Sequence, residues 1–353
     1  KRPVIYAGGG VILSGASKEL REFAEKINSP VTMTLLGLGS FPGNHELSLG
    51  MLGMHGTAYA NYAVQNCDLL IAIGARFDDR VTGKIDEFAP HAKVIHIDID
   101  PSAISKSVAV DVPIVGDVKC VLDEFLKMVH RPHDKEWTER VVEWKQKHPL
   151  YYKIDDRLRP QYVIQQICEA TKGEAIIATD VGQHQMWTAQ WYNFMRPREL
   201  LSSGGLGTMG YGFPAGIGAK VGKPDSEVFV ISGDGSIQMN IQELATAVVN
   251  KIDVKIAILN NSCLGMVRQW QELFYGKRYS HTKLENPDFV KIAEAYGAVG
   301  IRIRKKEEVR PAIEKAMNTK NVVVMDFIVE SEENVYPMVP AGKRLDDMIG
   351  SMA

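Results

Sequence analysis

The chain has 353 residues, a length typical of two domains rather than one. Its net charge is −2 and its basic residues are scattered, so we expect neither a nucleic-acid partner nor a membrane-binding patch. No apolar run reaches the roughly 18 residues of a transmembrane helix, and Lys1 leads into a strand-like segment without a signal or transit peptide, which predicts a cytoplasmic protein. The cysteines follow no metal-ligand spacing and are predicted to be free thiols: Cys67, Cys120, Cys168 and Cys263.

The first part of the sequence alternates apolar runs with glycines and helical patterns. Apolar runs that suit parallel strands covered by helices on both sides occur at residues 4–6, 69–73 and 94–97. Gly8-Gly9-Gly10 follows the first run. A helix is predicted over residues 16–27, because its apolar residues share one face: Leu20, Phe23, Ala24 and Ile27. This alternation predicts a doubly wound α/β domain over residues 1–128.

A second domain of the same class is predicted after a polar connection. Residues 129–158 contain Arg131-Pro132-His133-Asp134-Lys135 and a charged helix, and we interpret them as an interdomain linker. Residues 159–353 then alternate again. Strands are predicted at 175–178, 227–231, 254–259 and 322–328, and helices at 161–171, 211–221, 241–250, 287–296 and 306–318. The predicted fold class is therefore α/β, with two doubly wound parallel-sheet domains of which the first is Rossmann-like.

Two polar motifs follow predicted strands of the second domain. Gly233-Asp234-Gly235 follows one strand, and Asn260-Asn261 follows the next after 24 intervening residues. Ligands bind at the carboxyl ends of parallel strands in doubly wound sheets. Asp234 offers a carboxylate and Asn261 an amide oxygen, which are hard ligands of the kind that Mg²⁺ prefers. The pair therefore predicts a site for a Mg²⁺-bound diphosphate, although Gly-Asp-Gly alone is typical of a turn.

The residues around the acidic motif also suit an anion. Glycine lets the backbone come close to phosphate, because no Cβ intervenes. Gly235-Ser236 is predicted to open a helix, and a helix N-terminus favours anions. The whole pattern resembles the thiamine-diphosphate motif of enzymes that act on pyruvate and other 2-keto acids.

Longer segments resemble the catalytic subunit of the acetolactate synthase (acetohydroxyacid synthase) family. They are Leu52-Gly53-Met54-His55-Gly56-Thr57, Arg76-Phe77-Asp78-Asp79-Arg80-Val81-Thr82-Gly83-Lys84, Val181-Gly182-Gln183-His184-Gln185-Met186-Trp187, Ser202-Ser203-Gly204-Gly205-Leu206-Gly207 and Leu264-Gly265-Met266-Val267-Arg268-Gln269-Trp270. The resemblance covers nearly the whole chain and is with the family's central and C-terminal domains. It implies that residues 1–128 form the flavin domain, that residues 159–353 form the thiamine-diphosphate domain, and that the N-terminal pyrimidine-binding domain is absent.

The resemblance assigns roles by position in the second domain. It implies thiamine-diphosphate contacts from Gly182, Gln183, His184, Gly207, Met209, Gly233, Asp234, Gly235, Ser236, Asn261, Cys263, Gly265 and Met266. It implies Mg²⁺ ligation by the Asp234 and Asn261 side chains and by the Cys263 carbonyl. Met209 matches an apolar wedge that holds the cofactor bent, and Met266 and Trp270 match the cofactor and substrate channel. Taken alone, His184 is compatible with an ordinary loop histidine, and Met209 and Trp270 with packing residues.

The resemblance also implies that FAD lies along the first domain, in a largely structural role. The matching positions are Gly8, Gly9, Thr34, Leu35, Leu52, Met54, His55, Gly74, Ala75, Arg76, Asp78, Arg80, Asp98, Ile99, Asp117 and Val118. Their chemistry is suitable, because Arg76 can pair with phosphate and the acidic residues can accept hydrogen bonds from adenosine. The glycine run lacks the full Gly-x-Gly-x-x-Gly spacing, so an empty Rossmann-like domain is the alternative.

The implied reaction joins pyruvate to a second 2-keto acid with loss of CO₂. Pyruvate as the acceptor gives 2-acetolactate and 2-ketobutyrate gives 2-aceto-2-hydroxybutyrate, in branched-chain amino-acid biosynthesis. The expected partners are a second copy of the chain, in a homodimer or homotetramer, a small regulatory subunit, and the N-terminal domain that carries the activating glutamate. Two alternatives stay open: a noncatalytic cofactor-binding or assembly module, and a related thiamine enzyme such as glyoxylate carboligase or pyruvate oxidase. Trp270 and the segment 76–84 argue against the related enzymes.

Overall fold

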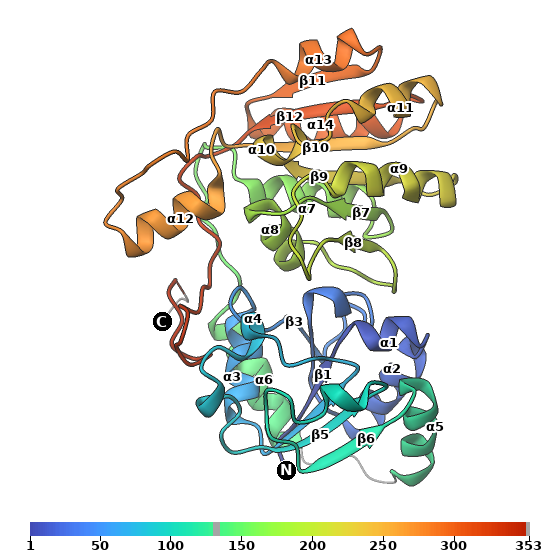
Figure 1. Cartoon of the computed structure of the whole chain (residues 1–353), viewed down its shortest axis with the longest axis vertical. Coiled ribbons are helices and arrows are strands. Elements are labelled where there is room, and N and C mark those ends of the chain that lie inside the picture. The colour runs from blue at the N-terminus through green and yellow to red at the C-terminus, as the bar shows by residue number, and fades with distance from the viewer. Residues whose placement is uncertain (130–134, 351–353) are drawn as a thin grey trace. The chain divides into compact units, whose positions relative to one another are not determined.

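A computed structural model describes residues 1–129 and 135–350 of the chain (Figure 1). The chain divides into two compact units. Unit 1 comprises Lys1–Tyr151, Asn193–Arg198 and Tyr336–Ala353, and unit 2 comprises Tyr152–Tyr192 and Glu199–Val335. No helix of the described ranges is both long and apolar enough to cross a membrane.

Unit 1 contains a six-stranded parallel sheet in the order β3-β2-β1-β4-β5-β6. Its strands are β1 (Pro3–Ala7), β2 (Val31–Met33), β3 (Ser48–Met51), β4 (Leu69–Ile73), β5 (Lys93–Asp98) and β6 (Val112–Val115). Its helices are α1 (Gly9–Leu13), α2 (Ser17–Ile27), η1 (Leu35–Gly37), α3 (Ala58–Asn66), α4 (Asp79–Thr82), η2 (Ile85–Glu87), η3 (Pro101–Ala103), α5 (Val118–Met128) and α6 (Lys135–Lys147). β1 pairs with β2 on one side and with β4 on the other, so the strand order reverses there and leaves a crevice at the carboxyl ends of β1 and β4.

Strand β1 and helix α2 of the first domain bury the apolar residues that predicted them. β1 is buried along its whole length, as expected of a strand covered on both faces. The apolar stripe of α2 is buried as predicted, and the helix ends at Asn28, which adopts a left-handed conformation with φ 49°. The predicted linker contains α6, whose Trp137 donates a hydrogen bond from its indole nitrogen to the Pro3 carbonyl at 2.9 Å. Residues 130–134 of that linker lie outside the described residues, and the domain boundaries stay predictions.

Unit 2 contains a second six-stranded parallel sheet, in the order β11-β12-β10-β9-β7-β8. Its strands are β7 (Ile176–Thr179), β8 (Leu200–Ser202), β9 (Val228–Gly233), β10 (Lys255–Asn260), β11 (Val299–Ile303) and β12 (Val323–Ile328). Its helices are α7 (Pro160–Ala170), α8 (Gln183–Trp191), α9 (Gly212–Gly222), α10 (Asp234–Ile237), α11 (Glu243–Val249), α12 (Gly265–Phe274), α13 (Phe289–Ala295) and α14 (Lys306–Met317). Here the strand order reverses between β7 and β9. Both sheets confirm the predicted fold class.

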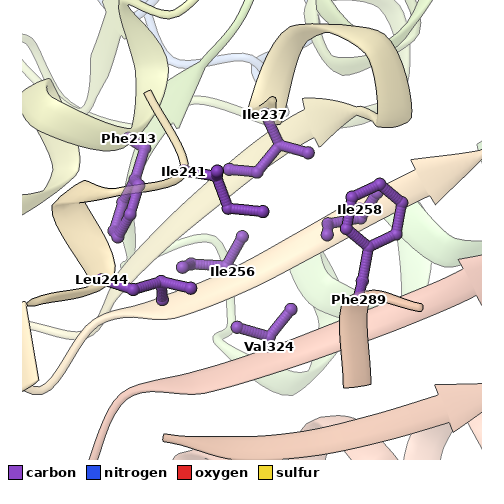
Figure 2. Close-up of a pocket in the computed structure, with 8 residues that line it drawn as sticks. All are labelled: Phe213, Ile237, Ile241, Leu244, Ile256, Ile258, Phe289 and Val324. Atoms are coloured by element: carbon purple, nitrogen blue, oxygen red, sulfur yellow. The ribbon is translucent and has the colours of Figure 1, made fainter. Parts of the chain in front are cut away.

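Apolar side chains from helices and strands fill the core on one side of the unit 2 sheet. They surround a small cavity with room for about one water molecule (Figure 2). Its lining is Phe213, Ile237, Ile241, Leu244, Ile256, Ile258, Phe289 and Val324. Because that lining offers no hydrogen-bonding side chain, the cavity is a packing gap in the core rather than a ligand site.

Candidate functional site

Three loops of unit 2 meet where its strand order reverses. They follow β7, β9 and β10 at the same carboxyl edge of the sheet, which is where doubly wound folds bind ligands (Figure 1). The loop after β7 leads into Gln183 and His184 at the start of α8. The loop after β9 leads into Asp234, and the loop after β10 contains Asn261. The topology therefore brings together the two motifs that the sequence singled out.

Asp234 is a buried carboxylate at the end of β9, with 1% of its surface exposed. Burial raises the pKa of Asp234 to about 6, and hydrogen bonds from the Asn286 amide and from backbone N–H groups oppose that shift. The groups that stabilise its charge are neutral hydrogen-bond donors. A buried carboxylate supported in this way gains stability from a cation at its remaining lone pairs, as a Mg²⁺ site requires.

Asn261 is held by neighbours that also belong to the predicted site. Its amide nitrogen donates to Gln183 Oε1 at 3.3 Å, and its amide oxygen accepts the Cys263 N–H at 3.1 Å. A Cβ at Gly265 would lie only 2.0 Å from Gln183 Oε1 and 2.9 Å from the Asn261 amide nitrogen. Glycine is therefore needed at this position for the Gln183 and Asn261 side chains to keep their places.

His184 is buried beside the acidic motif and has hydrogen-bonding capacity to spare. A Cβ at Gly233 would lie 2.9 Å from His184 Nδ1, so the ring packs directly on that glycine. Burial lowers the pKa of His184 to about 4, although the Asp180 charge and carbonyl oppose the shift. Within the described part of the chain, Nε2 is buried and has no hydrogen-bond partner. The negative charge of a diphosphate would favour the protonated ring, whose Nε2–H could then donate to a phosphate oxygen, so this ring fits the predicted diphosphate site.

The donor set explains why the metal would need its phosphate ligand. Among the described residues, no three His, Cys, Asp or Glu side chains cluster closely enough to hold a metal ion. The predicted ligands are one carboxylate, one amide oxygen and one carbonyl. Mg²⁺ commonly completes such a set with phosphate oxygens and water rather than with further side chains. The residues therefore fit a Mg²⁺-diphosphate pair better than a metal ion alone.

Met209 lies over the acidic motif on the loop between β8 and α9. Its terminal methyl carbon, Cε, is 3.9 Å from the place of a Cβ on Gly235. The loop is tied down by Asp180, which accepts hydrogen bonds from the N–H groups of Gly210 at 2.6 Å and Gly212 at 3.3 Å. The loop therefore holds Met209 beside Gly235, and its role as a wedge stays a prediction.

The other predicted residues of unit 2 occupy the same edge of the sheet or the helix that leaves it. Gly207 has φ 77°, a left-handed conformation that favours glycine. Ser236 donates from its hydroxyl to the Val181 carbonyl at 3.1 Å, which links α10 to the loop that contains Gly182. Met266 and Trp270 lie on α12, and the Trp270 ring packs on Phe274 with ring centroids 5.2 Å apart.

The positions predicted to contact FAD gather at the carboxyl edge of the unit 1 sheet. They follow or end all six strands: Gly8 and Gly9 after β1, Thr34 and Leu35 after β2, Leu52, Met54 and His55 after β3, Gly74, Ala75, Arg76, Asp78 and Arg80 after β4, Asp98 and Ile99 at and after β5, and Asp117 and Val118 after β6. Leu52, Ala75 and Val118 are buried, whereas Ile99 is 70% exposed. The positions therefore share one edge of the sheet and include both buried and exposed side chains, and their contacts with FAD stay a prediction.

Two details of the unit 1 edge refine the prediction. A Cβ on Gly8 would lie 2.2 Å from the Gly74 carbonyl oxygen, so Gly8 is needed for close packing of its own chain. Arg76 is largely exposed and forms an ion pair with Asp78 at 2.8 Å, which leaves guanidinium donors available for a phosphate. Asp117 caps α5 through the N–H groups of Lys119 and Cys120.

Sequence reasoning missed two polar residues that organise the unit 2 edge. Asp180 follows an apolar strand just as Asp234 does, and that position is a signal that could have identified it. Asn286 precedes a proline in a segment without periodicity, and nothing in its sequence context distinguishes it. Its Nδ2 lies 2.6 Å from Asp234 Oδ2, a contact that only the tertiary fold creates.

Comparison with known proteins assigns both units. Residues 1–125 match the family described as thiamine pyrophosphate enzyme, central domain, and residues 180–327 match its C-terminal TPP binding domain. Similar curated proteins include the acetolactate synthase large subunits of Corynebacterium glutamicum (52% identical) and Buchnera aphidicola (48% identical), each aligned with 99% of this chain. The acetolactate synthase isozyme 3 large subunit of Escherichia coli is 45% identical over 99% of this chain.

The chain spans only part of these relatives, namely 58% of the Corynebacterium protein, 62% of the Buchnera protein and 63% of the Escherichia coli protein. The matches confirm the predicted resemblance and the presence of a thiamine-diphosphate-binding domain. The chain therefore belongs to the thiamine pyrophosphate enzymes, as a homologue of acetolactate synthase large subunits that contains their central and C-terminal domains.

Proposed function

We propose that this chain forms the flavin and thiamine-diphosphate portion of an acetolactate synthase, which condenses pyruvate with a second 2-keto acid and releases CO₂. The observation that carries the proposal is the meeting of Asp234, Asn261 and His184 where the strand order of unit 2 reverses. The similarity to acetolactate synthase large subunits from bacteria supports the choice of reaction. The products would be 2-acetolactate from pyruvate and 2-aceto-2-hydroxybutyrate from 2-ketobutyrate, in branched-chain amino-acid biosynthesis.

The side chains of unit 2 divide the work of holding the cofactor. Asp234, Asn261 and the Cys263 carbonyl would bind Mg²⁺, and Gln183 and protonated His184 would hydrogen-bond the diphosphate. Gln183 Nε2 donates to Gln269 Oε1 and the Glu333 carbonyl, so it would exchange one of these acceptors for a phosphate oxygen. Gly207 and Met209 would contact the aminopyrimidine, with Met209 as the apolar support of the bent cofactor. Thiamine diphosphate would supply the electron sink for decarboxylation and carbon–carbon bond formation, and the protein would orient it and exclude water.

Trp270 would line the substrate channel and favour the larger 2-ketobutyrate as the second substrate. It is half-buried on α12, the helix that starts at Gly265 beside Gln183. Replacing Trp270 with leucine should therefore change the ratio of the two products in a competition between pyruvate and 2-ketobutyrate, and should leave cofactor affinity nearly unchanged. An unchanged product ratio would make Trp270 a packing residue.

The proposed enzyme would also contain FAD, a pyrimidine-binding domain and further subunits. FAD would lie along the carboxyl edge of the unit 1 sheet in a structural role, supported there by the exposed Arg76–Asp78 pair. A pyrimidine-binding domain would supply the glutamate that activates the aminopyrimidine ring. Pairing of two copies would complete each site in a homodimer or homotetramer, and a small regulatory subunit would be a further partner.

Product analysis with a complementing domain tests the proposal. The purified chain is supplied with Mg²⁺, thiamine diphosphate, FAD and pyruvate, with and without the N-terminal domain of a relative as a separate polypeptide. We expect acetolactate only in the complemented reaction. A different condensation product, or oxidation of pyruvate, would replace acetolactate synthase with a related thiamine enzyme. Cofactor binding without any turnover in either reaction would favour a noncatalytic module.

A further inference from the structure

Asn286 lies beside the proposed metal ligand with every atom of its amide group engaged. It sits on the loop that leads into α13 and is half-buried. Its Nδ2 donates to Asp234 Oδ2 at 2.6 Å and to Asn260 Oδ1 at 3.0 Å. Its Oδ1 accepts a hydrogen bond from Gln238 Nε2 at 3.2 Å. An amide with three partners is fixed in orientation, so the Asn286–Asp234 contact is directed rather than incidental.

The group that holds Asn286 is itself anchored across the sheet. Asn260 on β10 donates from Nδ2 to Asp326 Oδ1 on β12 at 2.9 Å. Asp326 Oδ2 accepts from Arg302 Nε on β11 at 3.2 Å, and Arg302 pairs with Asp288 at 2.6 Å. Asp288 caps α13 and lies two residues after Asn286, so the chain of contacts closes on itself. Three adjacent strands and one helix therefore fix the place of the Asn286 amide.

This arrangement fixes one oxygen of the Asp234 carboxylate. Oδ2 accepts the short hydrogen bond from Asn286, which stops rotation of the carboxylate about its last torsion. Backbone N–H groups also donate to this carboxylate, and its remaining lone pairs are available to a cation. Partners that hydrogen-bond to a metal ligand commonly orient it, and their removal typically weakens metal binding about 10–100-fold.

We propose that Asn286 is a positioning residue, which orients the Asp234 carboxylate toward the divalent cation and thereby sets the affinity of the site for that cation. The inference rests on the proposed function, because it takes Asp234 as a metal ligand. It goes beyond that function by assigning control of metal affinity to a residue outside the Gly-Asp-Gly and Asn-Asn motifs.

Mn²⁺ binding tests the inference without relying on turnover. The full chain is titrated with Mn²⁺ in the presence of thiamine diphosphate, and free Mn²⁺ is followed by electron paramagnetic resonance. Asn286→Ala should weaken Mn²⁺ binding about 10–100-fold and should change the spectrum of the bound ion, because its ligand field is altered. Asn286→Leu keeps the branching at Cγ without a donor and should weaken binding to a similar extent.

Asn321→Ala provides the matched control. Asn321 is also half-buried in unit 2, and both ends of its amide are likewise engaged, although by backbone groups, the Gly297 carbonyl and the Val322 N–H, at the opposite end of β12. We expect this variant to bind Mn²⁺ as the wild type does, even if its melting temperature falls. A merely structural role of Asn286 would lower the melting temperature in the same way and leave the bound-Mn²⁺ spectrum unchanged.

The outcomes separate this inference from the function on which it rests. If the wild type binds Mn²⁺ saturably and both Asn286 variants bind it with the same affinity and spectrum, Asn286 does not position the ligand, and the proposed site stands. If the wild type itself binds no Mn²⁺ in the presence of thiamine diphosphate, the proposed metal site is wrong, and the inference falls with it.

Discussion

Both units contain a six-stranded parallel sheet, but they hold the acidic residues at their strand ends in different ways. In unit 1, Asp78 and Asp117 accept hydrogen bonds from backbone N–H groups two or three residues further along the chain. In unit 2, Asp180 accepts from Gly210 and Ser232, which are 30 and 52 residues away. Asp234 and Asn286 are likewise 52 residues apart. Asp78 and Asp117 of unit 1 are therefore held by local turns and caps, whereas Asp180 and Asp234 of unit 2 also depend on contacts between distant segments.

Among the tests of this difference between the units, replacing Asp180 should have the largest effect on the free energy of unfolding. Asp180 is fully buried and is the acceptor for the Gly210 and Gly212 N–H groups and the Ser232 hydroxyl. Asp180→Ala should lower the free energy of unfolding by about 3 kcal/mol or more, because each buried donor left without an acceptor costs about 1–3 kcal/mol. Hydrogen exchange followed by mass spectrometry should localise the loss of protection to unit 2. A loss below about 1 kcal/mol would contradict the non-local role.

A pH titration of stability probes His55, one of two histidines that are buried in the described part of unit 1. Burial lowers the pKa of His55 from 6.5 to about 4, against an opposing hydrogen bond with the Pro337 backbone. Between those pH values the unfolded chain binds a proton that the folded chain does not, so stability falls as pH falls from 6.5 to 4. Because glutamine does not titrate, the free energy of unfolding of His55→Gln should fall by up to about 3 kcal/mol less than that of the wild type over this pH range. The measurement is urea unfolding of both proteins across this range, and identical pH slopes would refute the assignment.

Replacing Gly8 at the carboxyl edge of the unit 1 sheet should lower the free energy of unfolding by an intermediate amount. A Cβ on Gly8 would meet the Gly74 carbonyl at 2.2 Å and the Ala75 Cα at 2.5 Å, and backbone atoms cannot move aside easily. Gly8→Ala should therefore destabilise unit 1 by about 1–3 kcal/mol. Gly116→Ala is the control, because its Cβ would be 3.5 Å from the Val121 side chain. Equal stabilities of the two variants in urea unfolding would show that the crevice is loosely packed.

The smallest expected effect comes from a local cap. Asp117 caps α5 by accepting the N–H groups of Lys119 and Cys120. Asp117→Ala should cost about 1 kcal/mol and should leave unit 2 unaffected in hydrogen exchange. Asp123→Ala on the exposed face of the same helix should change stability by less than about 0.5 kcal/mol. If Asp117→Ala destabilised the chain as much as Asp180→Ala, the distinction between local and non-local support would be lost.

The sequence predicted the parts of this structure whose signals are local. The buried face of α2, the strands β4 and β10, and the motif residues Asp234 and Asn261 all followed from periodicity or from position after an apolar run. α8 was not predicted, because it is buried on several sides and its residues show no apolar stripe. β8 has only three residues, too few for a clear pattern. The contact of Asn286 with Asp234 joins two loops and could not be predicted from either loop alone.

Calorimetric titration of the full chain with thiamine diphosphate tests the central claim, that the carboxyl edge of the unit 2 sheet holds a Mg²⁺-bound diphosphate. We predict binding in the presence of Mg²⁺, its loss on addition of EDTA, and a loss of about 100-fold or more in affinity for Asp234→Ala, because removing a charged ligand from a divalent site costs several kcal/mol. Hydrogen exchange should show that the variant keeps the fold of unit 2. Equal, Mg²⁺-independent affinity of the wild type and the Asp234→Ala variant would contradict the account.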